Sequence, residues 1–354
     1  MTMRTKGVVV LAPALMPMGD VGRRAIERVA NRPIVCHALE TLAAIGVAEI
    51  AVVAPPLTIG AVRPCLERES TAAPTLRFLP QTGRPDLLGA LGAAAAFVGE
   101  DAAVVHPGDG LLGDGADDLA ALLDTDFPDL MLLLHRSPDP REGLSPATER
   151  LLRIAELGGT APPRLALTGV SLFAPGALHA TVAAAAGTAP EPDLVTIAEA
   201  LASAGGRVEP SIVREWHRYD GDPRDLLELN RIVLDRQAAR WEPRDHAGNR
   251  VEGRVVIDPS ADVTDSIILG PCIIGAGARV ANSYIGPYTS IGAGAEIEGA
   301  EIVRSIVAET VRILHVSGRI EGSTIGRGAN IFRDFGLPRA MRLHVGEDAA
   351  VALN

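Results

Sequence analysis

The stretch ILGPCIIGAGARVANSYIGPYTSIGAGAEIEGAEI, residues 268–302, decides the fold of the C-terminal part of the chain. It carries branched aliphatic residues after six, six and five positions in turn, at Ile268, Ile274, Val280, Ile285, Ile291, Ile297 and Ile302. The repeat therefore has 17 residues and three aliphatic positions, with glycines and small polar residues between them. A repeat this short cannot bury its apolar side chains alone, so successive repeats must stack as coils. We predict a parallel β-helix.

The same count extends the β-helix in both directions. Upstream, Ile257 and Val263 stand at the same spacing. Downstream the count continues less regularly, through Ala308, Leu314, Ile325 and Ile331. About five coils fit before the chain ends. A loop-rich β-sandwich is the alternative, but it does not predict three registered columns of Ile and Val.

Composition is typical of a folded protein with about two domains. The chain has 354 residues, of which 47% are hydrophobic. No apolar run reaches the roughly 18 residues of a membrane span, and no signal-peptide pattern opens the sequence, so we expect a cytoplasmic protein without a membrane partner. A net charge of -11, without a basic run, argues against nucleic acid as a partner. The cysteines Cys36, Cys65 and Cys272 form no zinc motif, and we expect core positions for them.

Residues 7–240 alternate short apolar segments with helical ones. We predict buried strands at Gly7–Ala12, Ile50–Val53, Thr75–Leu79, Ala102–His106 and Leu130–His135, and helices at Pro33–Ile45 and Leu87–Val98. This alternation is typical of a doubly wound α/β sheet. A helix at Arg224–Arg240 is expected to link an α/β domain, residues 1–240, to a β-helix domain, residues 241–354.

An acidic turn follows the fourth predicted strand, in the sequence His106-Pro107-Gly108-Asp109-Gly110. Ligands of doubly wound sheets lie beyond the carboxyl ends of the strands. Asp109 is therefore placed to hold a divalent ion such as Mg²⁺ that bridges phosphate groups, because such ions take one or two carboxylates. Gly-Asp-Gly is also a common turn, and both interpretations stay open.

The loop after the first strand, residues 13–20 (PALMPMGD), stands where a nucleotide-binding sheet usually carries glycines. Its two prolines remove N–H donors and its two methionines add bulk, so it is poorly suited to cradle a triphosphate. Arg23 and Arg24 open the next helix and are candidates to meet an anion, although exposed helix arginines are common. Lys6 is the only lysine, so no later position offers a catalytic amine.

The eight histidines form no triad and no metal-spaced set. His315 and His344 fall in the C-terminal part, and a histidine on a β-helix can serve as the base of an acyltransferase that uses coenzyme A. Surface histidines are the commoner outcome.

Several stretches together resemble the long-form glucose-1-phosphate thymidylyltransferases. The similarity is carried by residues 283–292 (SYIGPYTSIG), 319–321 (RIE), 325–327 (IGR) and 221–231 (GDPRDLLELNR), and more weakly by 30–34 (ANRPI), 108–112 (GDGLL) and 165–170 (LALTGV). The resemblance implies a mixed sheet of the nucleotide-diphospho-sugar transferase type followed by a left-handed β-helix. It also implies a homo-oligomer that converts a nucleoside triphosphate and a sugar 1-phosphate to a nucleoside diphosphate sugar and pyrophosphate.

The resemblance also places nucleotide and metal groups on this sequence. Gln81 falls at the base-reading glutamine, and Asp86 stands where a glycine beside the nucleobase is expected. Asp109 matches the first metal aspartate. The second would fall at Tyr219, with Asp220 one residue later.

Other groups of the implied site are replaced. The glycine-rich phosphate loop is shortened and has lost its glycine pair, and its nearby lysine falls at Arg24. The Glu-Lys-Pro motif that holds the sugar phosphate appears as Glu156-Leu157-Gly158, so its lysine is a leucine. Glu156 and Gly169 remain as candidate ligand-binding positions. Single cationic groups are worth orders of magnitude in phosphoryl-transfer rates, so we predict that the standard reaction is absent or very slow.

Three functions remain as hypotheses. The first is a degenerate nucleotidyltransferase homologue that acts as a partner or regulator of a pathway enzyme, or binds another nucleotide or phosphorylated ligand. The second is an active nucleotidyltransferase that uses Asp109, Asp220, Arg23 and Arg24 on an unusual sugar or cyclitol 1-phosphate. The third is acyl transfer on the β-helix.

Overall fold

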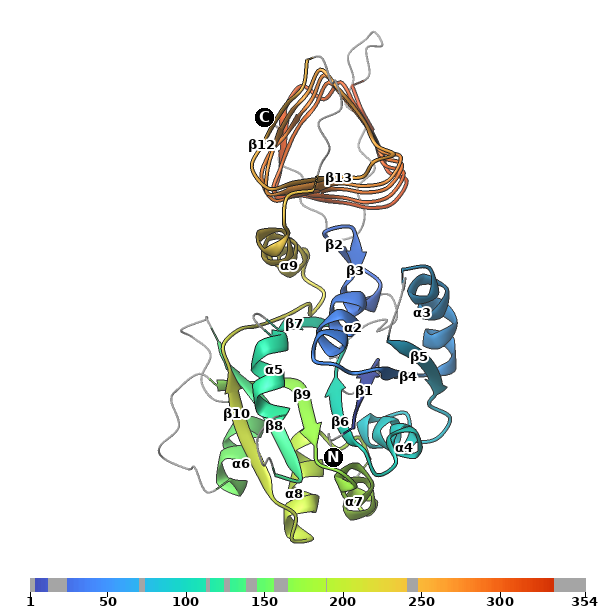
Figure 1. Cartoon of the computed structure of the whole chain (residues 1–354), viewed down its shortest axis with the longest axis vertical. Helices are drawn as coiled ribbons and strands as arrows, with labels where there is room; N and C mark the ends of the chain where they lie inside the picture. Colours follow the sequence, from blue (N-terminus) through green and yellow to red (C-terminus); the bar gives the residue numbers. More distant parts are fainter. Residues whose placement is uncertain are drawn as a thin grey trace. The chain divides into compact units, whose positions relative to one another are not determined.

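A computed structural model describes residues 4–11, 24–69, 74–112, 115–123, 128–137, 145–155, 165–188, 190–240 and 248–333. The chain divides into two compact units between Val233 and Leu234. The first unit is a sheet covered by helices, and the second is a stack of coils (Figure 1). Among the described residues, no helix combines the length and the apolar character needed to cross a membrane.

A seven-stranded mixed sheet forms the centre of the first unit, in the order β10-β8-β9-β6-β1-β4-β5. Its strands are β1 (Thr5–Val10), β4 (Glu49–Ala54), β5 (Thr75–Pro80), β6 (Ala102–His106), β8 (Leu130–Arg136), β9 (Leu165–Phe173) and β10 (Val208–Val213). Strand β9 runs antiparallel to both of its neighbours, and the other adjacent strands run parallel. The predicted α/β sheet is confirmed.

Helices cover both faces of this sheet. Helices α4 (Leu87–Val98), α6 (Pro146–Ile154), α7 (Ala177–Ala185) and α8 (Leu194–Ser203) share one apolar core with Val8 and Val10 of β1. Helices α2 (Ile34–Ala44), α3 (Pro56–Glu69) and α5 (Gly115–Leu123) share the other with Val9. Strands with two covered faces need apolar side chains, which explains the apolar runs 7–10 in β1, 50–54 in β4 and 102–105 in β6.

Two short ribbons and one helix complete the unit. Strand β7 (Gly110–Leu112) pairs antiparallel with β11 (Trp216–Arg218), and β2 (Arg28–Val29) pairs with β3 (Arg32–Pro33). Helix α9 (Pro223–Arg236) ends four residues before the predicted end at Arg240, which instead forms a parallel bridge to Val256.

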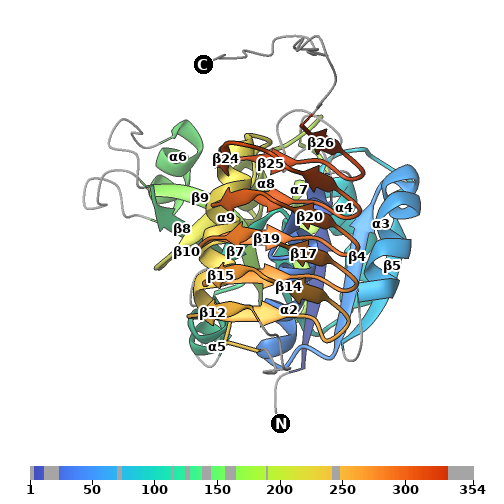
Figure 2. The same ribbon diagram turned by 90° about the horizontal axis from the view of Figure 1, so that it is seen from above.

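Three parallel five-stranded sheets form the second unit, as the 17-residue repeat predicts. The first contains β12 (Arg250–Glu252), β15 (Ile267–Leu269), β18 (Tyr284–Ile285), β21 (Glu301–Val303) and β24 (Arg319–Glu321). The second contains β13 (Val255–Ile257), β16 (Cys272–Ile274), β19 (Thr289–Ile291), β22 (Ile306–Val307) and β25 (Thr324–Ile325). The third contains β14 (Asp262–Thr264), β17 (Arg279–Ala281), β20 (Glu296–Glu298), β23 (Arg312–Leu314) and β26 (Asn330–Phe332). Figure 2 shows the coils stacked along their common axis.

The aliphatic columns follow the predicted count up to Ile302 and then slip by one residue. Ile291 pairs with Val307 and Ile297 with Ile313, and both partners are fully buried. The expected column residues Ala308 and Leu314 are therefore wrong by one position. The fourth coil has one residue fewer between Ile302 and Val307 and two more between Ile313 and Ile320, so that Ile302 pairs with Ile320.

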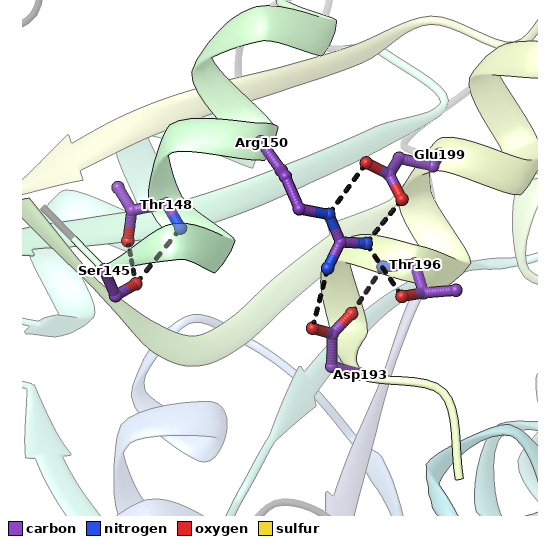
Figure 3. A network of polar contacts seen from close by, with 6 residues as sticks. All are labelled: Ser145, Thr148, Arg150, Asp193, Thr196 and Glu199. Atoms are coloured by element: carbon purple, nitrogen blue, oxygen red, sulfur yellow. Dashed lines mark hydrogen bonds and ion pairs between the residues drawn. The ribbon is translucent and has the colours of Figure 1, made fainter. Parts of the chain in front are cut away.

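Helices α6 and α8 are joined by one arginine (Figure 3). Arg150 of α6 donates to Glu199 and Asp193, with Nε–Oε1 and Nη1–Oδ2 distances of 2.9 and 3.2 Å, and to Thr196 Oγ1 at 2.8 Å. Asp193 also caps α8 by accepting the Thr196 N–H. At the start of α6, Ser145 accepts the Thr148 N–H in the same way. The guanidinium thus fixes two helices whose ends are independently capped.

Replacing Arg150 tests this connection. Arg150→Met should lower the free energy of unfolding of the first unit by about 1–2 kcal/mol, because several charge-assisted hydrogen bonds are lost at once. Arg207→Met removes a single exposed pair, Arg207 to Glu209 at 3.4 Å, and should change it by less than about 0.5 kcal/mol. Urea unfolding of both variants measures the difference, and equal effects would contradict the role of the network.

Candidate functional site

The turn after β6 buries an aspartate at the carboxyl edge of the sheet. Asp109 has no exposed surface, and Gly108 before it has a φ of +76°. A Cβ on Gly108 would lie 2.6 Å from Leu11 Cδ2, so the chain needs glycine here for both reasons. Asp109 is thus held at the position that the strand pattern predicted.

A short ribbon brings an arginine to this aspartate. In the antiparallel pairing of β7 with β11, Arg218 lies opposite Gly110. Arg218 Nε donates to Asp109 Oδ2 at 2.6 Å, and the Tyr219 N–H donates to the Asp109 carbonyl at 2.9 Å. Asp109 Oδ1 and Arg218 Nη2 are buried and have no hydrogen-bond partner among the described residues. The carboxylate therefore has an internal cation.

Burial and charge act in opposite directions on Asp109. Burial raises the pKa of its carboxyl to about 6, while Arg218 and Arg24 act to lower it. At neutral pH the group is an ionised partner of Arg218. His106, at the end of β6, is also fully buried, which lowers its pKa to about 3. Its Nδ1 accepts the Gly108 N–H at 2.9 Å, so this neutral ring helps to hold the turn.

Arg24 contacts Asp220 beside this turn, but through the backbone carbonyl of Asp220 and not through its carboxylate. Arg24 Nη1 donates to the Asp220 carbonyl at 2.8 Å. The Asp220 side chain accepts the Asp222 N–H at 3.1 Å, and its hydrogen bond with Asp225 lowers its pKa. Burial, together with this partner, raises the pKa of Asp225 to about 6. Asp220 is therefore one half of a carboxyl pair at the start of α9.

The predicted nucleobase residues lie in the loop before α4. Gln81 is 6% exposed, and its amide group donates to the carbonyls of Arg84 and Asp86. Its Oε1 is buried without a partner among the described residues. Asp86 caps α4 through the Gly89 N–H at 2.8 Å and pairs with Arg84 at 2.7 Å. Burial acts to raise the pKa of Asp86, and these hydrogen bonds outweigh it and lower the pKa.

Gly169 lies in β9 with a φ of +83°, and a Cβ there would be 3.3 Å from Pro107 Cγ. It therefore lies against the turn that holds Asp109. The structure thus gathers Arg24, Asp109, Gly169 and Asp220 around one region, while Gln81 and Asp86 belong to the loop after β5. The predicted residues Arg23 and Glu156, with Leu157 and His344, lie outside the described residues.

Sequence reasoning missed Arg218. The signal that could have found it is its place one residue before Tyr219, the position assigned to a metal ligand. Its contact with Asp109 depends on the β7–β11 pairing, which joins segments about a hundred residues apart and leaves no periodic pattern in either. His315, the candidate acyl-transfer base, lies on the β-helix with Nε2 3.7 Å from Glu298 Oε1.

Comparisons with known proteins identify relatives along nearly the whole chain. A glucose-1-phosphate thymidylyltransferase of Streptomyces antibioticus is 30% identical over 343 residues, which cover 96% of each chain. The chain belongs to the glucose-1-phosphate thymidylyltransferase family. A protein of the same name from Streptomyces griseus, and the low-salt glycan biosynthesis nucleotidyltransferase Agl11 of Haloferax volcanii, are each 29% identical over 96% of both chains.

The fold comparison agrees. A crystal structure from Bacillus anthracis, provisionally assigned as a glucose-1-phosphate thymidylyltransferase and solved in complex with sucrose, matches with a TM-score of 0.51. It is 18% identical and covers 67% of this chain and 98% of its own. This similarity concerns the fold alone. No protein-family profile matches the chain.

Within this family assignment, the divalent ion can be tested against the residues present. No described group of three or more His, Cys, Asp or Glu side chains is close enough together to hold a metal ion. Asp109 is paired with a guanidinium, and a tyrosine stands at the second aspartate position. These residues do not fit a two-carboxylate Mg²⁺ site of the kind that the family resemblance implies.

The Asp109–Arg218 pair makes a prediction about stability. Arg218→Met should lower the free energy of unfolding by about 3 kcal/mol at neutral pH, because it leaves a buried carboxylate without a cation. Arg218→Met combined with Asp109→Asn should recover most of this loss. Urea unfolding of the four chains of the double-mutant cycle measures the coupling.

The loss should also depend on pH. Without Arg218, the pKa of Asp109 in the folded state rises further above its unfolded value, so the folded state is favoured when the group is protonated. The deficit relative to the wild type should therefore be largest near about pH 8 and shrink toward about pH 5. A deficit that grows on acidification would show that the pair does not work as described.

Proposed function

We propose that this chain is a sugar-nucleotidyltransferase homologue that no longer carries out the standard reaction. On this proposal it acts as a partner or regulator of another sugar-pathway enzyme, or binds a different nucleotide or phosphorylated ligand. The observation that carries the proposal is the ion pair between Asp109 and Arg218, 2.6 Å long and closed off from solvent at the carboxylate. We infer that Arg218 supplies the positive charge that a metal ion would otherwise bring to Asp109.

The chemistry of the two cations differs. A divalent ion at this position would bridge the protein to phosphate oxygens and neutralise the charge that develops on them in the transition state. A guanidinium carries one charge, and the Nε–H of Arg218 is already committed to Asp109. The sequence adds two further losses, Tyr219 for a metal ligand and Leu157 for the sugar-phosphate lysine. Each removes electrostatic stabilisation worth orders of magnitude in rate.

We further infer that the chain is a cytoplasmic homo-oligomer and that its parallel β-helix is left-handed, as the resemblance to the family implies. The family features that the chain retains support an architectural role. The three aliphatic columns of the β-helix run through five coils, while the groups that the family resemblance assigns to nucleotide binding are replaced or engaged in internal contacts.

An assay of pyrophosphate release tests the proposal. With dTTP, glucose 1-phosphate and Mg²⁺, the chain should be at least about 10⁴-fold slower than the Streptomyces antibioticus relative assayed beside it. The Asp109→Asn variant should bind Mn²⁺ no more weakly than the wild-type chain does, as measured by titration calorimetry. Turnover close to that of the relative, abolished by Asp109→Asn, would show instead that the chain is a working enzyme.

One observation favours an active or ligand-binding alternative. Gln81 Oε1 is a buried acceptor without a partner among the described residues, and an amide-type N–H such as N3–H of a pyrimidine would satisfy it. The alternative is a nucleotidyltransferase with a changed substrate. A screen of nucleoside triphosphates with sugar and cyclitol 1-phosphates, followed by Gln81→Met on any active combination, distinguishes it. Turnover that is lost in Gln81→Met would favour this alternative.

A further inference from the structure

One outer face of the β-helix is apolar at its centre. On the sheet of β12, β15, β18, β21 and β24, inward residues alternate with outward ones, and the outward side chains of the three middle strands include Ile267, Leu269, Tyr284 and Val303. Ile267 is 41% exposed. We call these four side chains the apolar face. They add nothing to the inner core, which is formed by the inward residues of the same strands.

The sheet of β14, β17, β20, β23 and β26 shows the usual alternative. Its outward column contains Arg279, Glu296 and Arg312 on three consecutive strands. Arg312 Nε lies 2.8 Å from Glu296 Oε2, and Arg279 Nη1 lies 3.9 Å from Glu296 Oε1. A ladder of alternating charge runs along this column, while the second outward column of the same sheet contains Glu298, Leu314 and Phe332. The apolar face therefore does not follow from the β-helix fold itself.

Two side chains of the apolar face lie over a glycine. A Cβ on Gly286 would lie 2.7 Å from Val303 Cγ2 and 3.0 Å from Tyr284 Cε1, so both side chains lie across this glycine. Beside them is a depression of about 480 Å³, lined in part by Ile267, Tyr284 and Glu301. An apolar surface that includes such a hollow is suited to contact with another protein surface.

Charges frame the apolar face at both ends in the same order. On β12 the outward pair is Arg250 and Glu252, with Nε–Oε1 at 2.7 Å. On β24 it is Arg319 and Glu321. The register aligns Arg250, Ile267, Tyr284, Glu301 and Arg319 in one column. Each end of the face thus has an arginine in this column and a glutamate in the next one.

This order selects one symmetric pairing. A two-fold axis parallel to the β-helix axis exchanges the two columns within each coil, so Arg250 meets Glu252 of the partner subunit and Arg319 meets Glu321 of the partner subunit. The apolar residues then meet each other. A two-fold axis along the strands would instead oppose coil one with coil five and bring arginine against arginine. Like charges in contact disfavour that arrangement.

We propose that the apolar face binds a second copy of this chain, with the two-fold axis parallel to the β-helix axis. The inference rests on the homo-oligomer proposed above and names its contact surface. Glu301 is neutralised within its own chain by Arg319, at 3.2 Å, and so does not oppose the partner's Val303 as a free charge. Four spacings of about 4.8 Å between its five strands make this sheet about 19 Å long, short enough that we expect reversible association.

Sedimentation velocity of the full chain over a range of concentrations tests the face. Ile267→Lys should raise the dissociation constant of this contact at least about 30-fold, because it puts a charge into the centre of the interface. Thr264→Lys, on an exposed strand position of another sheet, is the matched control and should leave it unchanged. At a concentration where the wild-type chain is monomeric, thermal midpoints of both variants should equal that of the wild type, since both side chains point outward.

Charge reversal tests the axis. Arg319→Glu alone and Glu321→Arg alone should each weaken association about 10-fold, and an equimolar mixture of the two variants should restore it. Arg312→Glu, which removes a similar ion pair on the charged sheet, should have no effect. Stronger association of Arg319→Glu, or a dimer indifferent to Ile267→Lys, would overturn the proposal while leaving a homo-oligomer in place. A chain that is monomeric at every concentration would overturn both.

Discussion

A buried carboxylate needs a counter-charge, and this constraint shapes the carboxyl edge of the sheet. Asp109 is placed without solvent contact by the turn after β6, where Gly108 must be glycine and His106 must be neutral. The penalty for an unpaired charge in such a place is several kcal/mol. The β7–β11 ribbon offsets this penalty. Its register places Arg218 against the Asp109 carboxylate and the Tyr219 N–H against the Asp109 carbonyl.

The identity of the counter-charge has consequences for chemistry. A metal ion is exchangeable and keeps free coordination positions for substrate, whereas an arginine is tethered and uses donors to hold its carboxylate. On the proposal above, Arg218 fills this role and Asp220 does not act as a second ligand to a shared ion. It instead shares a hydrogen bond with Asp225 at the start of α9. A turn that buries a carboxylate can therefore be stabilised by an internal cation instead of a metal ion.

Local patterns predicted the fold well where the pattern itself carries the packing. The five predicted strands and the helix at Leu87–Val98 lie where the sequence placed them, because strands covered on both faces need continuous apolar residues. The expected burial of Thr75–Leu79 is wrong, since β5 is an edge strand whose residues are all exposed or half-buried. The β-helix columns hold up to Ile302, and the slip to Val307 and Ile313 occurs where one coil is shorter. The sequence period cannot predict where a coil gains or loses a residue, because the stacked strands stay in register when the change falls in a corner between strands.

The site was predicted only in part, for a different reason. Asp109 follows a strand and so inherits its position from local sequence, as does Gln81 after β5. Arg218 depends on a pairing between distant segments. Asp86 was assigned to a ligand pocket by resemblance, yet its carboxylate caps α4 and binds Arg84. A helix cap and a ligand contact use the same residue type, so the sequence could not separate them.

In a β-helix, the alternation of inward and outward residues uncouples the core from the surface. Ile268, Ile285 and Ile302 would stabilise the coils equally well whichever outward residues flank them. The outward columns are therefore free to differ, and they do, with a charged ladder on one sheet and an apolar face on another. Exposed apolar side chains are not stabilised by contact with water, and they do not contact the apolar core of the coils. The side chains of the apolar face are thus free to make the contact with a second copy proposed above, because no contact within the coils depends on them.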